Sequence, residues 1–147
     1  MLEIKLSKNM TITSDGKFNY ILTKDEKPIG YYNSWERLHQ AMNRGNKKLT
    51  KKDLEKINEV SATLDTSFKE INNTCKKFKH EDNINVSVFE YDIKGTNFNE
   101  VLIYKKGTNT ILASIGTIQS ALEKILELKL MNGEDLTKST KQILKSL

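Results

Sequence analysis

The sequence predicts an α+β protein built from two similar halves, each with an antiparallel meander followed by helices, around a long central helix. Three observations predict this class. Segments in which apolar and polar residues alternate come in two groups, a capped helix follows each group, and a heptad pattern occupies the middle of the chain. A polar segment at residues 80–83 marks the boundary. We therefore expect one half at residues 1–80 and another at 81–147, sharing one core.

The first half starts with an extra strand at residues 2–6, where apolar and polar residues alternate. Three more strands follow, and a turn is expected at Asp15-Gly16. Ser34 is then a good N-cap for a short helix that ends at Gly45-Asn46. The three strands are expected at residues 10–13, 17–23 and 29–32. The residues at helical spacing are Trp35, Leu38, His39 and Met42.

A long helix is expected from about residue 50 to about residue 79. The segment from Thr50 to Asp53 resembles a capping box, with Asp in the place of the usual Glu. Apolar and small residues then repeat at alternating spacings of three and four, which is a heptad seam. This seam is either the face of a central core helix or the contact of a dimeric coiled coil. It consists of Leu54, Ile57, Ser61, Leu64, Phe68, Ile71, Cys75 and Phe78.

The second half repeats the order of three strands and two helices. Its strands are expected at residues 84–93, 98–105 and 110–115. Gly116-Thr117 caps the next helix, and a last helix follows from about residue 134 to about residue 146. The complete order is therefore βββαα twice, with an extra strand at the N-terminus.

The two halves align when sequence numbers are offset by 83, so that Ser34-Trp35-Glu36 meets Thr117-Ile118-Gln119. Few identities accompany this similarity of pattern. It reflects either a duplication or two meanders that each need a capped helix. At this offset the paired apolar residues are Phe18 with Val101, Tyr20 with Ile103, Ile29 with Leu112, Tyr32 with Ile115, and Met42 with Ile125.

Composition favours a protein of a reducing compartment. A single cysteine, Cys75, excludes an internal disulfide. The N-terminal segment has no apolar stretch typical of a signal peptide, and no apolar run approaches the ~20 residues of a membrane span. We therefore expect a cytoplasmic protein.

The residues that usually carry catalysis are few and scattered. Cys75 lies on the apolar seam, where a buried structural thiol is expected. His39 is expected beside Trp35 in the short helix, and His80 in the polar segment. Three carboxylates, Glu90, Asp92 and Glu100, could meet across a hairpin, but solvated side chains are the expectation. No motif for a metal or for phosphate is present, so we expect neither an enzyme nor a cofactor.

A basic cluster precedes and enters the long helix, with five cations in nine residues and no acid between them. It consists of Arg44, Lys47, Lys48, Lys51 and Lys52. Residues 1–80 carry 16 Lys and Arg against 10 Asp and Glu, whereas residues 81–147 carry 8 against 9. The cluster is either a contact for a polyanion or acidic partner, or a consequence of an AT-rich genome. Nearby aromatic residues that could stack on bases are Tyr31, Tyr32 and Trp35.

Three segments between residues 10 and 45 resemble a family of short phage-encoded proteins of unknown function. They are Thr11-Ile12-Thr13-Ser14-Asp15, Phe18-Asn19-Tyr20-Ile21-Leu22, and Gly30-Tyr31-Tyr32-Asn33-Ser34 with Leu38. They are similar to a run that can be written ITSD…YIL…GYY-S-x-x-x-L, although the segment before GYY is shorter here. The resemblance implies a phage or prophage origin in a low-GC bacterium.

Together these observations lead to two functional hypotheses. The first is a non-enzymatic phage accessory protein that binds and inhibits a bacterial host macromolecule, such as a CRISPR effector. Its partner would be a host protein or ribonucleoprotein. The alternative is a single-stranded DNA- or RNA-binding protein that uses the basic cluster. A homodimer is compatible with either hypothesis, and no membrane is expected to take part.

Overall fold

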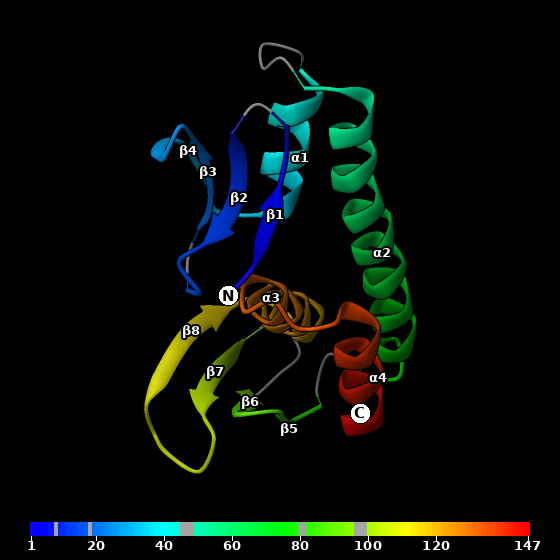
Figure 1. Cartoon of the computed structure of the whole chain (residues 1–147). Coiled ribbons are helices and arrows are strands. Elements are labelled where there is room, and N and C mark those ends of the chain that lie inside the picture. Colours follow the sequence, from blue (N-terminus) through cyan, green and yellow to red (C-terminus); the bar gives the residue numbers. More distant parts are fainter. Residues whose placement is uncertain (8, 18, 45–48, 80–81, 96–99) are drawn as a thin grey trace. The chain divides into compact units, whose positions relative to one another are not determined.

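A computed structural model of the chain describes residues 1–7, 9–17, 19–44, 49–79, 82–95 and 100–147. Over these residues the protein is α+β, with two four-stranded antiparallel sheets and four helices in the order ββββαα twice (Figure 1). The long helix α2 (Lys51–Cys75) separates the two groups of strands along the chain. The predicted fold class is therefore confirmed.

The chain forms two compact units, and the two halves of the sequence exchange helical segments between them. Unit 1 comprises residues 1–65 and 127–136, and unit 2 comprises residues 66–126 and 137–147. Each half keeps its own sheet. The exchanged segments are the last part of α2 and the last part of α3 (Ile118–Met131), so both of these helices contribute to both units.

Sheet A of unit 1 is a meander in the order β1-β2-β3-β4. Its alternating sequence places Ile12, Tyr20 and Leu22 on one buried face. Helix α1 (Trp35–Asn43) lies against the sheet, with Leu38 and Met42 also buried (Figure 1). The strands are β1 (Glu3–Lys5), β2 (Met10–Ser14), β3 (Tyr20–Lys24) and β4 (Lys27–Tyr32).

Within unit 1, hydrogen bonds tie the last part of α3 to sheet A, to the residue before it and to the start of α1. The Leu2 N–H donates to the Met131 carbonyl over 2.9 Å, and the Ser14 hydroxyl donates to the same carbonyl. The Glu127 carboxylate accepts from the Tyr20 hydroxyl (3.1 Å) and from the Trp35 N–H (2.8 Å). These long-range bonds have no local sequence signal, so the exchange of segments could not be read from the sequence.

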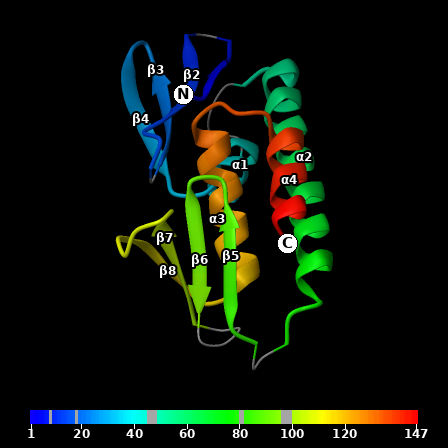
Figure 2. The same ribbon diagram turned by 90° about the horizontal axis from the view of Figure 1, so that it is seen from below.

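Sheet B of unit 2 has four strands in the order β5-β6-β7-β8, where the sequence predicts three. The expected strand at 84–93 folds into a hairpin with Phe89 and Glu90 at its turn (Figure 2). Phe89 adopts a left-handed backbone (φ 54°), a conformation usually signalled by Gly or Asn. That is why the pattern did not reveal this turn. The strands are β5 (Ile84–Val88), β6 (Tyr91–Gly95), β7 (Val101–Lys105) and β8 (Ile111–Ile115).

Helix α3 buries Ile118, Leu122 and Ile125 in unit 2. Helix α4 (Leu136–Ser146) follows, and in unit 2 its Thr140 hydroxyl lies 2.8 Å from the Ser67 hydroxyl of α2. Across the described ranges, none of the helices combines the length and apolar character needed to cross a membrane.

Helix α2 starts with the predicted capping box and ends earlier than expected, at Cys75. The Asp53 N–H donates to the Thr50 hydroxyl and the Thr50 N–H donates to the Asp53 carboxylate, each over 3.2 Å. The seam is buried or half-buried within the single chain, as a core helix requires. Its buried members are Ile57, Ser61, Leu64, Ile71 and Cys75, and its half-buried members are Leu54, Phe68 and Phe78.

The two sheets repeat each other in register as well as in order. In sheet A, β2 pairs with β3 so that Met10 lies opposite Lys24. In sheet B, β6 pairs with β7 so that Tyr91 lies opposite Lys105. The other pairs follow in the same register, so Met10 corresponds to Tyr91 and Ser14 to Gly95. Both sheets shift register at the same place, after Leu22 in β3 and after Ile103 in β7. A common bulge at a common position favours duplication over independent origin.

Equivalent residues differ in number by 81 when β2 and β3 are matched with β6 and β7. The difference rises to 83 when β4 is matched with β8, because the loop before β8 is longer than the loop before β4. Tyr32 pairs with Tyr20 as Ile115 pairs with Val101. Tyr20 therefore corresponds to Val101, and the predicted match of Tyr20 with Ile103 is wrong. Phe18 lies outside the described residues. The matches of Ile29 with Leu112, Tyr32 with Ile115, and Met42 with Ile125 agree with the observed register and helix positions.

The helix caps also match, with Ser34 in the place of Thr117. The Ser34 hydroxyl accepts from the Arg37 N–H over 3.2 Å, and the Thr117 hydroxyl accepts from the Ser120 N–H over 3.1 Å. Each cap satisfies one of the free donors at the start of a helix. The repeat thus includes the four strands of each sheet and the helix that follows them.

Candidate binding surfaces

The predicted basic cluster is divided between the end of α1 and the start of α2. Arg44 caps α1, and its N–H donates to the Gln40 carbonyl over 3.1 Å. The side chains of Arg44, Lys51 and Lys52 are exposed. Lys47 and Lys48 lie outside the described residues. The described part of the cluster is therefore open to solvent and accessible to a charged partner.

A buried carboxylate fixes the start of α2 beside these lysines. Asp53 is 3% exposed and accepts hydrogen bonds from the Ser7 N–H (3.0 Å) and the Ser7 hydroxyl as well as from Thr50. Burial raises the pKa of Asp53, but the bonds from Ser7 and Thr50 outweigh it and lower the pKa to about 2. Asp53 therefore anchors the helix to the connection between β1 and β2.

Of the three aromatic candidates, Trp35 is unsuitable for stacking on a base. It is 1% exposed, and its ring meets Tyr20 edge-on with centroids 5.4 Å apart. Its indole N–H donates to the Ser61 hydroxyl over 2.6 Å, which explains the small polar residue in the seam. The prediction of Trp35 as a contact residue is therefore wrong, because the side chain fills the core of unit 1.

The two neighbouring tyrosines are more accessible than Trp35. Tyr31 is 62% exposed on β4, whereas Tyr32 is half-buried. Tyr20 on β3 is buried. Its pKa is raised by burial, by the charge of Glu127 and by the hydrogen bond to that carboxylate. Tyr31 is therefore the best placed of the predicted aromatic contacts.

The residues with catalytic side chains have structural surroundings. Cys75 is buried, and burial is the main reason why its pKa is raised to about 11. The charge of Lys77 lowers this pKa and the charge of Glu123 raises it. The thiol is therefore protonated at neutral pH and is a poor nucleophile. His39 Nε2 lies 2.7 Å from the Asn58 side-chain oxygen, and His80 lies outside the described residues. Within the described ranges, no group of His, Cys, Asp and Glu side chains could hold a metal ion.

The three carboxylates near the β5–β6–β7 meander do not converge as a pair of catalytic acids. Glu90 lies at the β5–β6 turn, whereas Glu100 precedes β7 at the opposite end of the β6–β7 pair. Asp92 is buried rather than solvated. It accepts from the Ser87 hydroxyl (2.6 Å) and the Gly107 N–H (3.0 Å), and these bonds lower its pKa. Asp92 thus holds the β7–β8 loop against β6.

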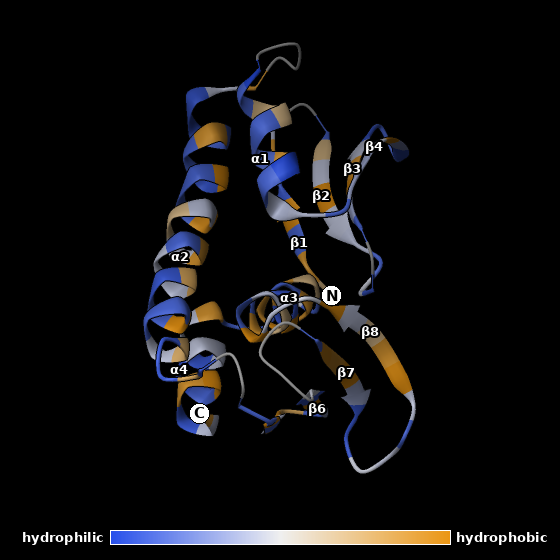
Figure 3. Cartoon of the chain, turned by 180° about the vertical axis from the view of Figure 1, so that it is seen from behind, coloured by the Kyte–Doolittle hydropathy of each residue, from blue (hydrophilic) through white to orange (hydrophobic). Residues whose placement is uncertain are grey.

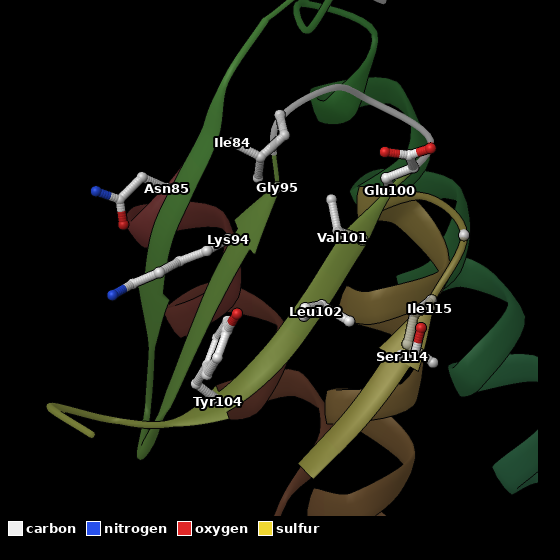
Figure 4. A pocket seen from close by; sticks show the side chains of 11 residues that line it. Ile84, Asn85, Lys94, Gly95, Glu100, Val101, Leu102, Tyr104, Ser114 and Ile115 are labelled. Atoms are coloured by element: carbon white, nitrogen blue, oxygen red, sulfur yellow. The ribbon is translucent and has the colours of Figure 1, made fainter. Parts of the chain in front are cut away.

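A shallow groove of about 600 Å³ lies on sheet B and was not predicted. One cross-strand row of residues, Asn85, Lys94, Leu102 and Ser114, lines it (Figure 4). Tyr104 stands next to Lys94, whose ammonium group lies 5.6 Å from the ring centroid. Glu100 lines the groove near its other end. The groove therefore combines apolar, aromatic, amide and oppositely charged groups on one sheet face.

Only a weak signal in the sequence points to this groove. Tyr104 and Leu102 alternate with Ile103 in β7, so their outward position follows from strand periodicity. Lys94 meets Leu102 only through the β6–β7 register, and β6 was hidden in the predicted single strand at 84–93. A correct hairpin prediction at Phe89 was needed to find the site.

Comparisons with known proteins give no further identification. The chain matches no family model, no curated protein and no solved structure at a significant level.

Proposed function

We propose that this chain is a non-enzymatic phage accessory protein that binds and inhibits a bacterial host macromolecule in the cytoplasm, such as a CRISPR effector. The groove on sheet B is the observation that carries the proposal. Protein interfaces are enriched in aromatic residues and combine an apolar centre with a polar rim. Leu102 and Tyr104 supply the apolar and aromatic centre of the groove. Its polar rim consists of Lys94, Asn85 and Glu100.

The charge of the groove favours a protein surface over nucleic acid as its partner. Lys94 and Glu100 carry opposite charges, and residues 81–147 have a net charge of −1, from 8 basic and 9 acidic residues. Affinity for a polyanion comes chiefly from uncompensated cations. Occlusion of a protein surface therefore fits this groove better than mimicry of DNA or contact with phosphates.

The test is capture from a host lysate, quantified by mass spectrometry, with a matched pair of variants. Lys94→Ala/Tyr104→Ala truncates two of the groove side chains, and Thr13→Ala/Thr23→Ala changes the equivalent positions of sheet A. A true partner is retained by the wild type and the sheet A control and lost at least tenfold by the groove variant. The purified partner should also lose activity when the wild type is added. A captured protein retained equally by all three chains contradicts the proposal.

A second candidate function is binding of single-stranded nucleic acid in unit 1. The exposed side chains of Arg44, Lys51, Lys52 and Tyr31 support it, since cations bind phosphates and aromatic rings stack on bases. A salt titration with single-stranded and duplex oligonucleotides is the test. This function predicts a steep salt dependence that weakens in Lys51→Glu/Lys52→Glu, and absence of binding at low salt contradicts it.

A further inference from the structure

Strand β8 is an exposed and uncharged edge of sheet B. It is one of the two outermost strands in the order β5-β6-β7-β8, and Ile111 and Leu112 are 56% and 51% exposed. None of its five residues carries a charge. It also lies within the longest uncharged stretch of the sequence, residues 107–122. Figure 3 shows hydrophobic colouring along much of this strand.

Natural proteins usually protect such edges, because unpaired strands recruit other strands. The equivalent edge of this chain, β4, is protected in the usual way. It begins with Lys27 and Pro28, and proline has no N–H to donate to a neighbouring strand. Both edges occupy the same place in the repeat and contain the same bulge, with Ile29 and Leu112 as the extra residues, so the bulge does not account for the absence of charge and proline in β8.

We propose that β8 pairs antiparallel with β8 of a second copy of this chain, so that the two sheets B form one eight-stranded sheet. Two identical antiparallel strands are related by a twofold axis, which gives a closed, self-complementary contact. Like charges directly opposite each other destabilise a strand pair. Because β8 has no charge, no register within residues 111–115 places like charges opposite one another.

The same lack of charge argues for a second copy over a charged peptide as the occupant. A peptide rich in acidic or basic residues would be selected by complementary charges at the edge, and β8 offers none. Pairing also places a neighbouring strand beside Ile111 and Leu112, which removes part of their apolar surface from water.

The dimer has a geometric consequence for the groove. The twofold axis between antiparallel strands stands perpendicular to the sheet, so the outer faces of both copies point to the same side. Two copies of the groove lined by Lys94 and Leu102 then share one face of the eight-stranded sheet. The dimer itself does not depend on the function proposed for that groove.

The experiment is light scattering after size-exclusion chromatography over a dilution series. The wild type should approach twice the monomer mass at high concentration and dissociate on dilution. Leu112→Lys, which places a cation opposite its copy's edge, should stay monomeric. Ile29→Lys, at the equivalent position of β4, should dimerise like the wild type. A monomeric wild type, a dimeric Leu112→Lys, or loss of the dimer in both variants overturns the proposal.

Hydrogen exchange of the wild type gives a readout that needs no variant. Backbone amides of residues 111–115 should gain protection as concentration rises, and those of residues 27–32 should not. A doubled mass without added protection at 111–115 would place the contact elsewhere, for example on the α2 seam, and would overturn the proposal. Assembly into species larger than a dimer would also contradict the closed twofold contact.

Discussion

The two sheets keep equivalent inner faces and differ in their outer faces. Leu22 of sheet A corresponds to Ile103 of sheet B, and both are buried. On the outer face, Thr23 corresponds to Tyr104, and Thr13 corresponds to Lys94. The inner residues must fill a core, which favours apolar side chains at most of these positions. The outer residues are free of that constraint, and in sheet B they form a groove.

The buried carboxylates of the two units have similar hydrogen-bond donors but hold different elements together. Among the described residues these are Asp53 in unit 1 and Asp92 in unit 2, and each accepts from a serine hydroxyl and a backbone N–H. Asp53 ties a helix to a strand connection, whereas Asp92 ties a hairpin loop to a strand. Each of these carboxylates is therefore satisfied by hydroxyl and backbone donors, but for a different structural purpose.

The largest expected effect is on stability, from truncation of Trp35 at the start of α1, compared with truncation of Ile118 at the equivalent position of α3. Trp35→Ala should lower the free energy of unfolding by about 3–5 kcal/mol, since it leaves a large cavity and deprives Ser61 of its donor. Ile118→Ala, at the equivalent position, should cost less, near the lower end of the ~2–5 kcal/mol range for isoleucine. Urea denaturation measures both. Trp35→Phe, which keeps a ring and loses the indole N–H, should fall between the wild type and Trp35→Ala, and a larger loss in Ile118→Ala contradicts the comparison.

The next effect is the pH dependence of the stability that ionised Asp53 contributes. The folded pKa of about 2 lies below the ordinary value of 3.8, so ionised Asp53 stabilises the fold by about 2 kcal/mol above pH 4. This contribution is lost as pH falls from 3.8 through 2. Asp53→Ala should therefore be less stable than the wild type at pH 7, with a difference that shrinks towards pH 2. Urea unfolding from pH 6 to pH 2 measures it, and exposed Asp65→Ala is the control. A difference that is constant over this range would count against the anchor.

A smaller effect on stability is expected when Gly30 of β4 is replaced by alanine, the residue at the equivalent position of β8. A Cβ at Gly30 would come within 2.8 Å of the Tyr32 hydroxyl oxygen, whereas sheet B has Ala113 and Ile115 at the equivalent positions. Gly30→Ala should cost about 1 kcal/mol through this overlap. Gly30→Ala/Tyr32→Ile, which reproduces the sheet B pair, should recover that loss in a thermal or urea melt. A stabilising Gly30→Ala would mean that the Tyr32 ring moves aside at no cost.

The smallest effect concerns the groove itself. Lys94→Gln removes the cation from beside the Tyr104 ring and should lower stability by only about 0.5–1 kcal/mol. Thr13→Gln, at the equivalent position on sheet A, should have no such effect. A loss several times larger in Lys94→Gln would show that Lys94 supports the fold, and would weaken its assignment to a binding surface. Urea unfolding of both variants beside the wild type measures the difference.

Much of the fold follows from local patterns in the sequence. Alternation predicted β1 to β4, β7 and β8, and hydroxyl caps predicted the starts of α1 and α3. The capping box at Thr50 was also predicted, because it needs only residues one turn apart. The β5–β6 turn was missed, since a left-handed phenylalanine has no sequence signal. The correct match of Tyr20 with Val101 became clear only from strand register.

The candidate surfaces were predicted less well than the fold. The sequence identified the exposed Arg44, Lys51, Lys52 and Tyr31 but also selected Trp35, whose spacing equally suited the core that it fills. The groove joins residues of β6 and β7 whose contact depends on register, which a single sequence does not reveal.

The sequence by itself determined the α+β class, the two-part order of strands and helices, and the seam of α2, because periodicity and capping act between neighbours in the chain. Only the tertiary structure decided which helical segments join which unit and that Asp53 and Asp92 are buried. Those outcomes rest on hydrogen bonds and strand pairs between residues far apart in sequence, such as Ser7 with Asp53 and Trp35 with Glu127. Such contacts leave no periodic trace in the chain.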